Sequence, residues 1–226
     1  MIDPSADVRL AARALARHRL VHAYGHVSAR VDPASFLVTP PHPLGKTRLD
    51  TQLVTVPVEG DLPPGALPEV RMHQAIYRAR SDVGGICRFQ SDRVIALSAL
   101  RRTPRALHGL GAYFARDVGD GPPLWDDPML VRDVERANAV ATTLGSARGI
   151  VLRGNGAVTV GPTVREALCH AFFLEDAAKV ELSLLGQDAV AYSPDEASKR
   201  GNGGTRDQTL YDRMWEYLLD DDEVRS

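Results

Sequence analysis

The sequence has little of what several protein classes require. It contains only two cysteines in 226 residues, and its 27 basic residues do not outnumber its 29 acidic ones, which gives a net charge of −2. Two cysteines in apolar segments indicate buried thiols rather than a disulfide framework. The missing basic surplus argues against electrostatic binding of nucleic acid. No apolar run reaches the roughly 18 residues of a membrane-spanning helix, so no span is expected.

What is present is typical of a globular protein. Apolar residues make up 44% of the chain and charged residues 25%, and the length suits one compact domain. The first ten residues, "MIDPSADVRL", lack a basic stretch followed by an apolar one, so we expect a cytoplasmic protein. We expect residues 1–190 to form the body of the domain. Residues 191–226 should add a mobile, Gly-rich segment and a C-terminal helix.

Helix signals recur along the chain. A residue that caps a helix start, often followed by proline, precedes several apolar-periodic segments, and glycine follows some of them. Thr163 and Glu166 form a capping-box pattern ahead of a long apolar-periodic segment that Gly186 closes. These signals predict helices from Asp3-Pro4 to about His18, over 68–80, from Ser91 to about Leu100, from Asp127-Pro128 to before Gly145, from Thr163 to Gly186, and over 210–223.

Short β-branched runs lie between these helices. They predict strands at 36–39, 53–58 and 84–89. The segment "GIVLRGNGAVTVG" (149–161) predicts a hairpin, with Asn155-Gly156 as a type I′ turn. Strands mixed with helices and a hairpin indicate one layered α/β or α+β domain.

Several segments, in this order, resemble the class II aldolase/adducin family. They are "YGHVSAR" (24–30) with "FLVTP" (36–40), "PEVRMHQAIYRARSDV" (68–83), and "IVLRGNGAVTVG" with the helix after it. The resemblance covers about residues 6–190, and the "GHVSAR" version is closest to the decarboxylase-like branch. It implies a class II aldolase-like three-layer α/β/α fold with a mostly antiparallel central sheet. It also implies a homo-oligomer, commonly a tetramer, with active sites between neighbouring subunits.

The family typically holds one Zn, Mn or Fe ion with three histidines, a His-x-His at a strand end and a third at the hairpin turn. At the matching positions this chain has Arg88, Gln90 and Asn155. Arginine offers no lone pair, and amide oxygens are weak ligands for zinc or iron. We therefore expect no metal and no other cofactor. Arg88 would instead supply a fixed positive charge that binds a carboxylate or stabilises an oxyanion.

Glu69 matches the acid/base carboxylate of the family, and with Arg88 it forms the predicted catalytic pair. By position alone, Glu69 is also an ordinary first-turn acid that favours the helix dipole. Asn155 is equally explained by turn geometry. His73 shares a helix face with Glu69, and a lone helical histidine is more often packed and hydrogen-bonded than catalytic.

The resemblance places an anion-binding loop around residues 24–30. Its side chains, backbone N–H groups and nearby residues would bind a carboxylate or phosphate. The substrate-binding candidates are His26, Ser28, Arg30, Thr39, Lys46, Gln90, Asn155 and Tyr113. The alternative for the loop is a capped turn with a surface arginine.

Three functions remain open at this point. The first is a metal-independent lyase that decarboxylates or otherwise cleaves a small carboxylated or hydroxylated substrate through an enolate-like state. The second is a non-catalytic ligand-binding protein of the same fold. The third is a metalloenzyme whose ligands come from elsewhere, such as Glu69, Gln90 or Asp92.

Overall fold

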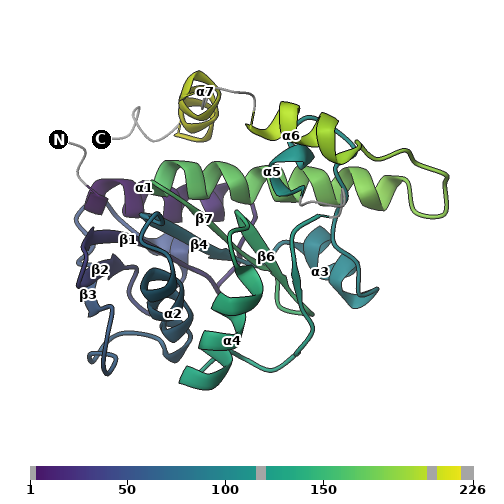
Figure 1. Ribbon diagram of the computed structural model, residues 1–226. Helices are drawn as coiled ribbons and strands as arrows, with labels where there is room; N and C mark the ends of the chain where they lie inside the picture. The colour runs from purple at the N-terminus through teal and green to yellow at the C-terminus, as the bar shows by residue number, and fades with distance from the viewer. Residues whose placement is uncertain (1–3, 116–120, 203–207, 220–226) are drawn as a thin grey trace.

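The computed structural model describes residues 4–115, 121–202 and 208–219 (Figure 1). Within them lies one seven-stranded sheet in the order β3-β2-β1-β4-β7-β6-β5. Neighbouring strands are antiparallel except β5 and β6, which are parallel. The strands are β1 (His26–Asp32), β2 (Ser35–Val38), β3 (Val54–Pro57), β4 (Gly85–Phe89), β5 (Leu124–Trp125), β6 (Gly149–Leu152) and β7 (Ala157–Gly161). The mostly antiparallel sheet is the one expected.

Helices cover both faces of this sheet (Figure 1). One face carries α1 (Pro4–Arg17), α3 (Asp92–Ala99) and α5 (Val164–Ser183), with α7 (Gln208–Leu219) packed outside α5. The other face carries α2 (Arg71–Ala79) and α4 (Val134–Leu144). Short 3₁₀ turns η1 (Leu44–Lys46), η2 (Pro68–Val70) and η3 (Gly111–Phe114), together with α6 (Pro194–Asn202), complete the elements. None of the helices in the described ranges is long and apolar enough to cross a bilayer.

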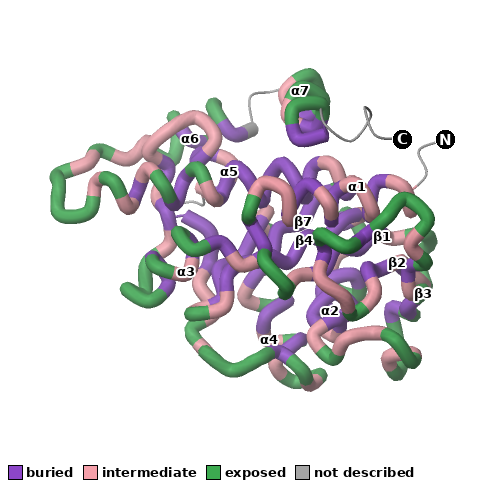
Figure 2. The backbone as a smooth tube through the Cα atoms, turned by 180° about the vertical axis from the view of Figure 1, so that it is seen from behind, coloured by how far each residue is buried: buried purple, intermediate pink, exposed green. Residues whose placement is uncertain are grey.

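The sheet separates two apolar clusters, and buried residues concentrate on its strands and on the helix faces turned toward them (Figure 2). Successive strand side chains point to opposite faces. On β4, Cys87 and Phe89 join the cluster under α1 and α5, whereas Ile86 joins the one under α2 and α4. Arg88 therefore points to the α2 side. The same alternation on β1 places His26 and Ser28 on that side as well.

Most of the predicted elements are confirmed. Ser91 accepts a hydrogen bond from the Val94 N–H, and Thr163 accepts one from the Glu166 N–H, so both predicted caps form. Both cysteines are buried free thiols, and burial raises the pKa of each. The last helix forms as α7, and its predicted residues 220–223 lie outside the described part.

The prediction of a helix starting at Asp127-Pro128 is wrong. The Asp127 carboxylate accepts the Met129 N–H at 2.9 Å and closes a local turn, which competes with helix formation. Helix α4 starts at Val134 instead, after Asp133 caps the Arg136 N–H at 2.8 Å. The segment expected to be irregular after residue 191 contains α6. Residues 203–207 of that segment are outside the described part.

The hairpin forms, but its turn is not type I′. A type I′ turn requires positive φ at both central residues, and among residues 153–156 only Gly154 (φ 70°) and Gly156 (φ 78°) have it. The Asn155 N–H closes the turn onto the Leu152 carbonyl at 2.9 Å. This geometry leaves the Asn155 side chain free to reach a neighbouring strand.

Candidate active site

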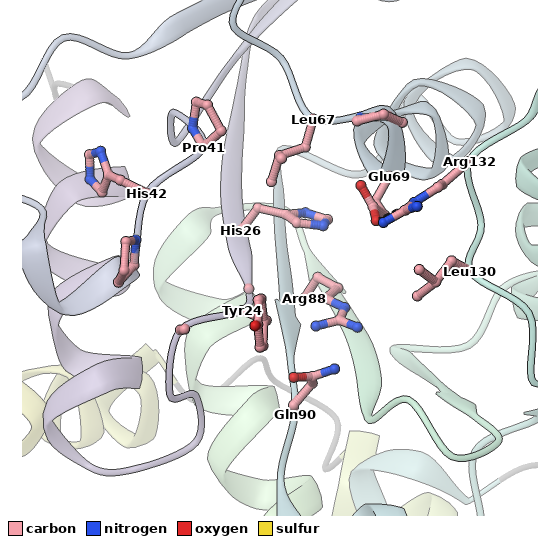
Figure 3. A pocket seen from close by; sticks show the side chains of 14 residues that line it. Tyr24, His26, Pro41, His42, Leu67, Glu69, Arg88, Gln90, Leu130 and Arg132 are labelled. Atoms are coloured by element: carbon pink, nitrogen blue, oxygen red, sulfur yellow. Dashed lines mark hydrogen bonds and ion pairs between the residues drawn. The ribbon is translucent and has the colours of Figure 1, made fainter.

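A cavity of about 540 Å³ opens where the start of β1 meets the end of β4 (Figure 3). Its polar lining includes His26 from β1, Arg88 and Gln90 from the end of β4, Glu69 from η2, Arg132 from the loop before α4, and His42 from the loop before η1. Tyr24, Leu67 and Leu130 form apolar parts of the wall. His26 and Arg88 are direct neighbours across the antiparallel β1–β4 pair. Two strand ends and two loops thus converge on one hollow.

Arg88 and Gln90, which line this cavity, both bind Asn155. The Asn155 Oδ1 accepts a hydrogen bond from Arg88 Nη2 at 2.6 Å and another from Gln90 Nε2 at 2.9 Å. Arg88 Nη2 also lies 3.2 Å from the Asn155 carbonyl. The three residues at the expected ligand positions are therefore adjacent. Gly156 makes this possible, because a Cβ there would lie 2.1 Å from the Phe89 carbonyl.

Arg88 is 5% exposed. Burial lowers its pKa to about 10, and the Glu69 carboxylate acts in the opposite direction. The guanidinium is therefore still positively charged at neutral pH. A buried cation of this kind interacts more strongly with an anion than it would in water.

Glu69 faces Arg88 across the cavity and is held by a second arginine. Its Oε1 accepts a hydrogen bond from Arg132 Nε at 2.8 Å, and its side chain is 18% exposed (Figure 3). Pro68 at the start of η2 fixes the turn that presents Glu69. Sequence reasoning missed Arg132, because it lies in the loop that was expected to be helical and no local pattern marks it.

His26 begins a buried chain of hydrogen bonds. Its Nδ1 lies 2.7 Å from His73 Nε2, His73 Nδ1 lies 2.6 Å from Ser28 Oγ, and Ser28 Oγ lies 2.9 Å from the Tyr77 hydroxyl. Burial, together with the nearby Arg88 cation, lowers the pKa of both imidazoles, that of His73 to about 3. Both rings are therefore neutral at physiological pH.

Two of the residues assigned to the anion-binding loop do not reach the cavity. Ser28 is fully buried and belongs to the hydrogen-bond chain. Arg30 turns away and donates to the backbone carbonyls of Tyr77, Arg80 and Val83. Both face the α2 side of the sheet, where the helix covers them.

Three other candidates also lie elsewhere. Thr39 is buried, and its hydroxyl accepts the Val27 N–H at 3.2 Å. Lys46 borders a separate surface hollow with Arg13 and Arg48. Tyr113 packs against Phe173 on the α5 side of the sheet. Of the predicted residues, the structure brings together His26, Glu69, Arg88, Gln90 and Asn155.

This donor set does not fit a divalent transition metal. Arg88 has no lone pair to donate, and the Asn155 Oδ1 already accepts two hydrogen bonds. Across the described ranges, no three His, Cys, Asp or Glu side chains are grouped so as to hold a metal ion. What the cavity offers is two guanidinium cations, two imidazoles and one carboxylate. Such a set binds an anion and can move a proton.

The chain was compared with known proteins. The family model described as "Class II Aldolase and Adducin N-terminal domain" matches residues 6–182. A 3,4-dihydroxyphthalate decarboxylase from Rhodococcus jostii is 24% identical over 202 residues, which is 81% of each chain. Human beta-adducin is 29% identical over 114 residues, which is 50% of this chain and 15% of adducin. An aldolase II superfamily protein from Pseudomonas syringae has the same fold, with a TM-score of 0.80, 22% identity, and 96% and 91% of the two chains covered.

Proposed function

The chain belongs to the class II aldolase and adducin family, and from this premise we propose that it is a metal-independent lyase that decarboxylates a small anionic substrate. The observation that carries the proposal is the cluster of Arg88, Gln90 and Asn155 opposite Glu69. In this cluster a buried guanidinium stands where the family resemblance expects a metal ion. A fixed cation can take over the charge stabilisation that a Lewis acid provides.

The substrate class follows from the charges in the cavity. Arg88 and Arg132 are both lining residues, and an arginine pairs with a carboxylate through two parallel hydrogen bonds. The volume of about 540 Å³ suits a small aromatic acid. The Rhodococcus relative is named for a dihydroxylated aromatic dicarboxylate. We therefore propose a hydroxylated aromatic carboxylate as the substrate, with 3,4-dihydroxyphthalate as the compound to test first.

In the proposed reaction the ring hydroxyl next to the leaving carboxylate binds as a phenolate, and Arg88 stabilises its negative charge. Glu69 in its acid form gives a proton to the ring carbon that bears this carboxylate, and the phenolate becomes a ring carbonyl. The bond between that carbon and the carboxylate carbon then breaks, and CO₂ leaves. The electron pair of the bond passes through the enolate-like π system to the carbonyl oxygen, which restores the aromatic ring and the phenolate, and Glu69 regains a proton from solvent.

The test is CO₂ release from 3,4-dihydroxyphthalate by the purified protein, before and after treatment with EDTA. We expect turnover that EDTA does not change. Glu69→Gln should lower kcat by about 100-fold or more, because a positioned acid or base typically contributes that much. Glu59→Gln is the matched control, since Glu59 also pairs with an arginine but lies away from the cavity.

Loss of turnover on chelation, with recovery on adding Zn, Mn or Fe, would refute metal independence. Equal kcat for Glu69→Gln and the wild-type protein would refute the role of Glu69.

The relationship to beta-adducin motivates a second candidate function, ligand binding without catalysis. In that case the closed hydrogen-bond cluster around Asn155 would serve only to fix Arg88 for anion binding. Calorimetry separates the two candidates. A protein that only binds would show saturable binding of 3,4-dihydroxyphthalate. It would release no CO₂, either as the wild-type protein or as Glu69→Gln.

A further inference from the structure

We infer that the buried chain Tyr77–Ser28–His73–His26 holds His26 in the tautomer that carries its proton on Nε2, so that the ring is a permanent hydrogen-bond donor into the cavity beside Arg88. The identity of the substrate that would accept this hydrogen bond rests on the proposed function. The assignment of the tautomer does not depend on it.

The chain is continuous and closed to solvent. All four side chains are at most 3% exposed, and the three links span 2.6 to 2.9 Å. His26 and Ser28 lie on one face of β1, and His73 and Tyr77 lie one helical turn apart on α2, so alternation on β1 and helical spacing on α2 align the four residues. His26 is the member that lines the cavity.

Each link can contain only one proton, because both rings are neutral. Three arrangements satisfy this. In the first, Tyr77 donates to Ser28, Ser28 donates to His73 Nδ1, and His73 Nε2–H donates to His26 Nδ1. In the second, every donor and acceptor is reversed, and Ser28 donates to the Tyr77 oxygen. In the third, Tyr77 and His73 Nδ1–H both donate to Ser28 Oγ, and His26 Nδ1–H donates to His73 Nε2.

The second arrangement leaves the Tyr77 hydroxyl hydrogen without an acceptor, since Ser28 is the one partner of that hydroxyl among the described residues. The third arrangement leaves the Ser28 hydroxyl hydrogen without an acceptor, since the bonds of that hydroxyl among the described residues are those to Tyr77 and His73. A buried donor without a partner is costly. The first arrangement pairs every hydrogen inside the chain and leaves only that of His26 Nε2, which faces the cavity. It makes His26 Nδ1 an acceptor, which puts the remaining proton on Nε2.

Nε2 is the ring nitrogen of His26 that His73 does not occupy, and the ring points into the cavity next to Arg88 and opposite Glu69 (Figure 3). An Nε2–H there can donate to a substrate oxygen that Arg88 also binds. It cannot act as a base, because a second proton would create an imidazolium beside the Arg88 cation. Of the two groups beside Arg88, His26 and Glu69, it is then Glu69 that is left to carry the proton.

The test is ¹⁵N NMR of the imidazole rings in the ligand-free full-length protein at neutral pH, with the His26 signals identified by their loss in His26→Gln. We expect one neutral tautomer with the proton on Nε2. A neutral ring protonated on Nδ1, or a doubly protonated ring, would overturn the inference.

Ser28→Ala tests whether the chain sets the tautomer. Without the hydroxyl, His73 Nδ1 loses its donor, and only the direction of the His73–His26 bond remains open. Its two directions differ little in unpaired groups. We expect both His26 tautomers to be populated. An unchanged single Nε2–H tautomer in Ser28→Ala would refute the role of the chain. Thr159→Val is the matched control, because it removes a buried sheet hydroxyl that bonds the Ala167 carbonyl and not the chain.

The donor role is tested with phthalate as the probe ligand. His26→Leu should weaken phthalate binding about tenfold, the typical loss of a hydrogen bond to a charged group. His26→Gln should restore most of the affinity, because its amide can donate from a similar position. Equal affinity of His26→Leu and the wild-type protein would contradict the donor role. The NMR measurement needs neither ligand nor turnover, so its outcome is separate from that of the decarboxylase assay.

Discussion

Single residues decide the charge of the cavity. Arg88 and Gln90 each donate a hydrogen bond to the same oxygen of Asn155, so the geometry that would bring three ligands together is present. The chemistry of the three side chains differs from that of histidine, because one is a cation and two are amides. The positive charge of the site therefore belongs to the Arg88 side chain, whereas in a metalloenzyme it would belong to a bound metal ion.

The chemistry of these three side chains predicts the effect of placing histidine at all three positions. The triple variant Arg88→His, Gln90→His and Asn155→His should bind one Zn²⁺ or Mn²⁺ per chain after desalting, because three neutral imidazoles suffice to hold such an ion with an open position. The wild-type protein should retain none. Elemental analysis by mass spectrometry measures both. Stoichiometric metal in the wild-type protein would contradict the prediction and revive a site with other ligands.

At the level of elements, the β6–β7 hairpin places Asn155 against the end of β4. The pairing of β4 with β7 runs from Gly85 with Gly161 to Phe89 with Ala157, so the hairpin turn lies directly beside Gln90. Gly156 allows this close approach in two ways. It has a positive φ of 78°, and it has no Cβ to meet the Phe89 carbonyl.

Gly156→Ala should therefore lower the free energy of unfolding by more than about 2 kcal/mol, the sum of backbone strain and a steric clash. Gly154→Ala is the matched control. Gly154 has a similar φ of 70°, but no atom lies within 4 Å of a Cβ placed there. Its cost should be only about 1 kcal/mol, from backbone strain alone. Urea denaturation measures both, and equal losses would show that the approach to β4 is not tight.

At the level of the whole molecule, the two buried histidines link stability to pH. Burial keeps His26 and His73 neutral in the folded protein, with the pKa of each below its ordinary value of 6.5. In the unfolded chain both titrate near 6.5. The unfolded state therefore binds more protons below that pH, and stability falls as the pH decreases.

Each histidine should contribute a slope of about 1.4 kcal/mol per pH unit below pH 6, continuing toward the folded-state pKa of about 3 for His73. Denaturant melts between pH 7 and pH 4.5 measure the slope. His26→Gln removes one of the two groups and should make the slope shallower. A His26→Gln slope equal to that of the wild-type protein would show that His26 does not stay neutral on folding.

The oligomeric state is also a property of the whole molecule. The family resemblance predicts a homotetramer with sites between neighbours. Tyr24 at the cavity is 70% exposed and Leu130 is 42% exposed, so apolar side chains line its open rim. Light scattering should give four times the chain mass of 24.6 kDa. A monomer mass at micromolar concentration would contradict this prediction.

Half of the predicted site residues proved to lie together, and they followed from the family resemblance combined with local pattern. Arg88 and Gln90 flank Phe89 at a strand end, and alternation alone puts them on one face. The caps at Ser91 and Thr163 formed as predicted, because a hydroxyl three residues before the matching N–H needs no distant partner. Arg132 could not be found this way, since its contact with Glu69 joins residues 63 positions apart.

The sequence by itself determined the family and most of the helices and strands of the body, because these depend on residue identity and short-range periodicity. It missed β1, whose residues were expected to form an anion-binding loop. The replacement of three metal-binding histidines stays a prediction from the family resemblance. Tertiary structure decided which polar residues share the cavity. Ser28 and Arg30 sit in the same segment as His26, yet helix α2 covers them and draws them into buried hydrogen bonds. The position of a side chain between solvent and core depends on the packing of distant elements, which local pattern does not specify.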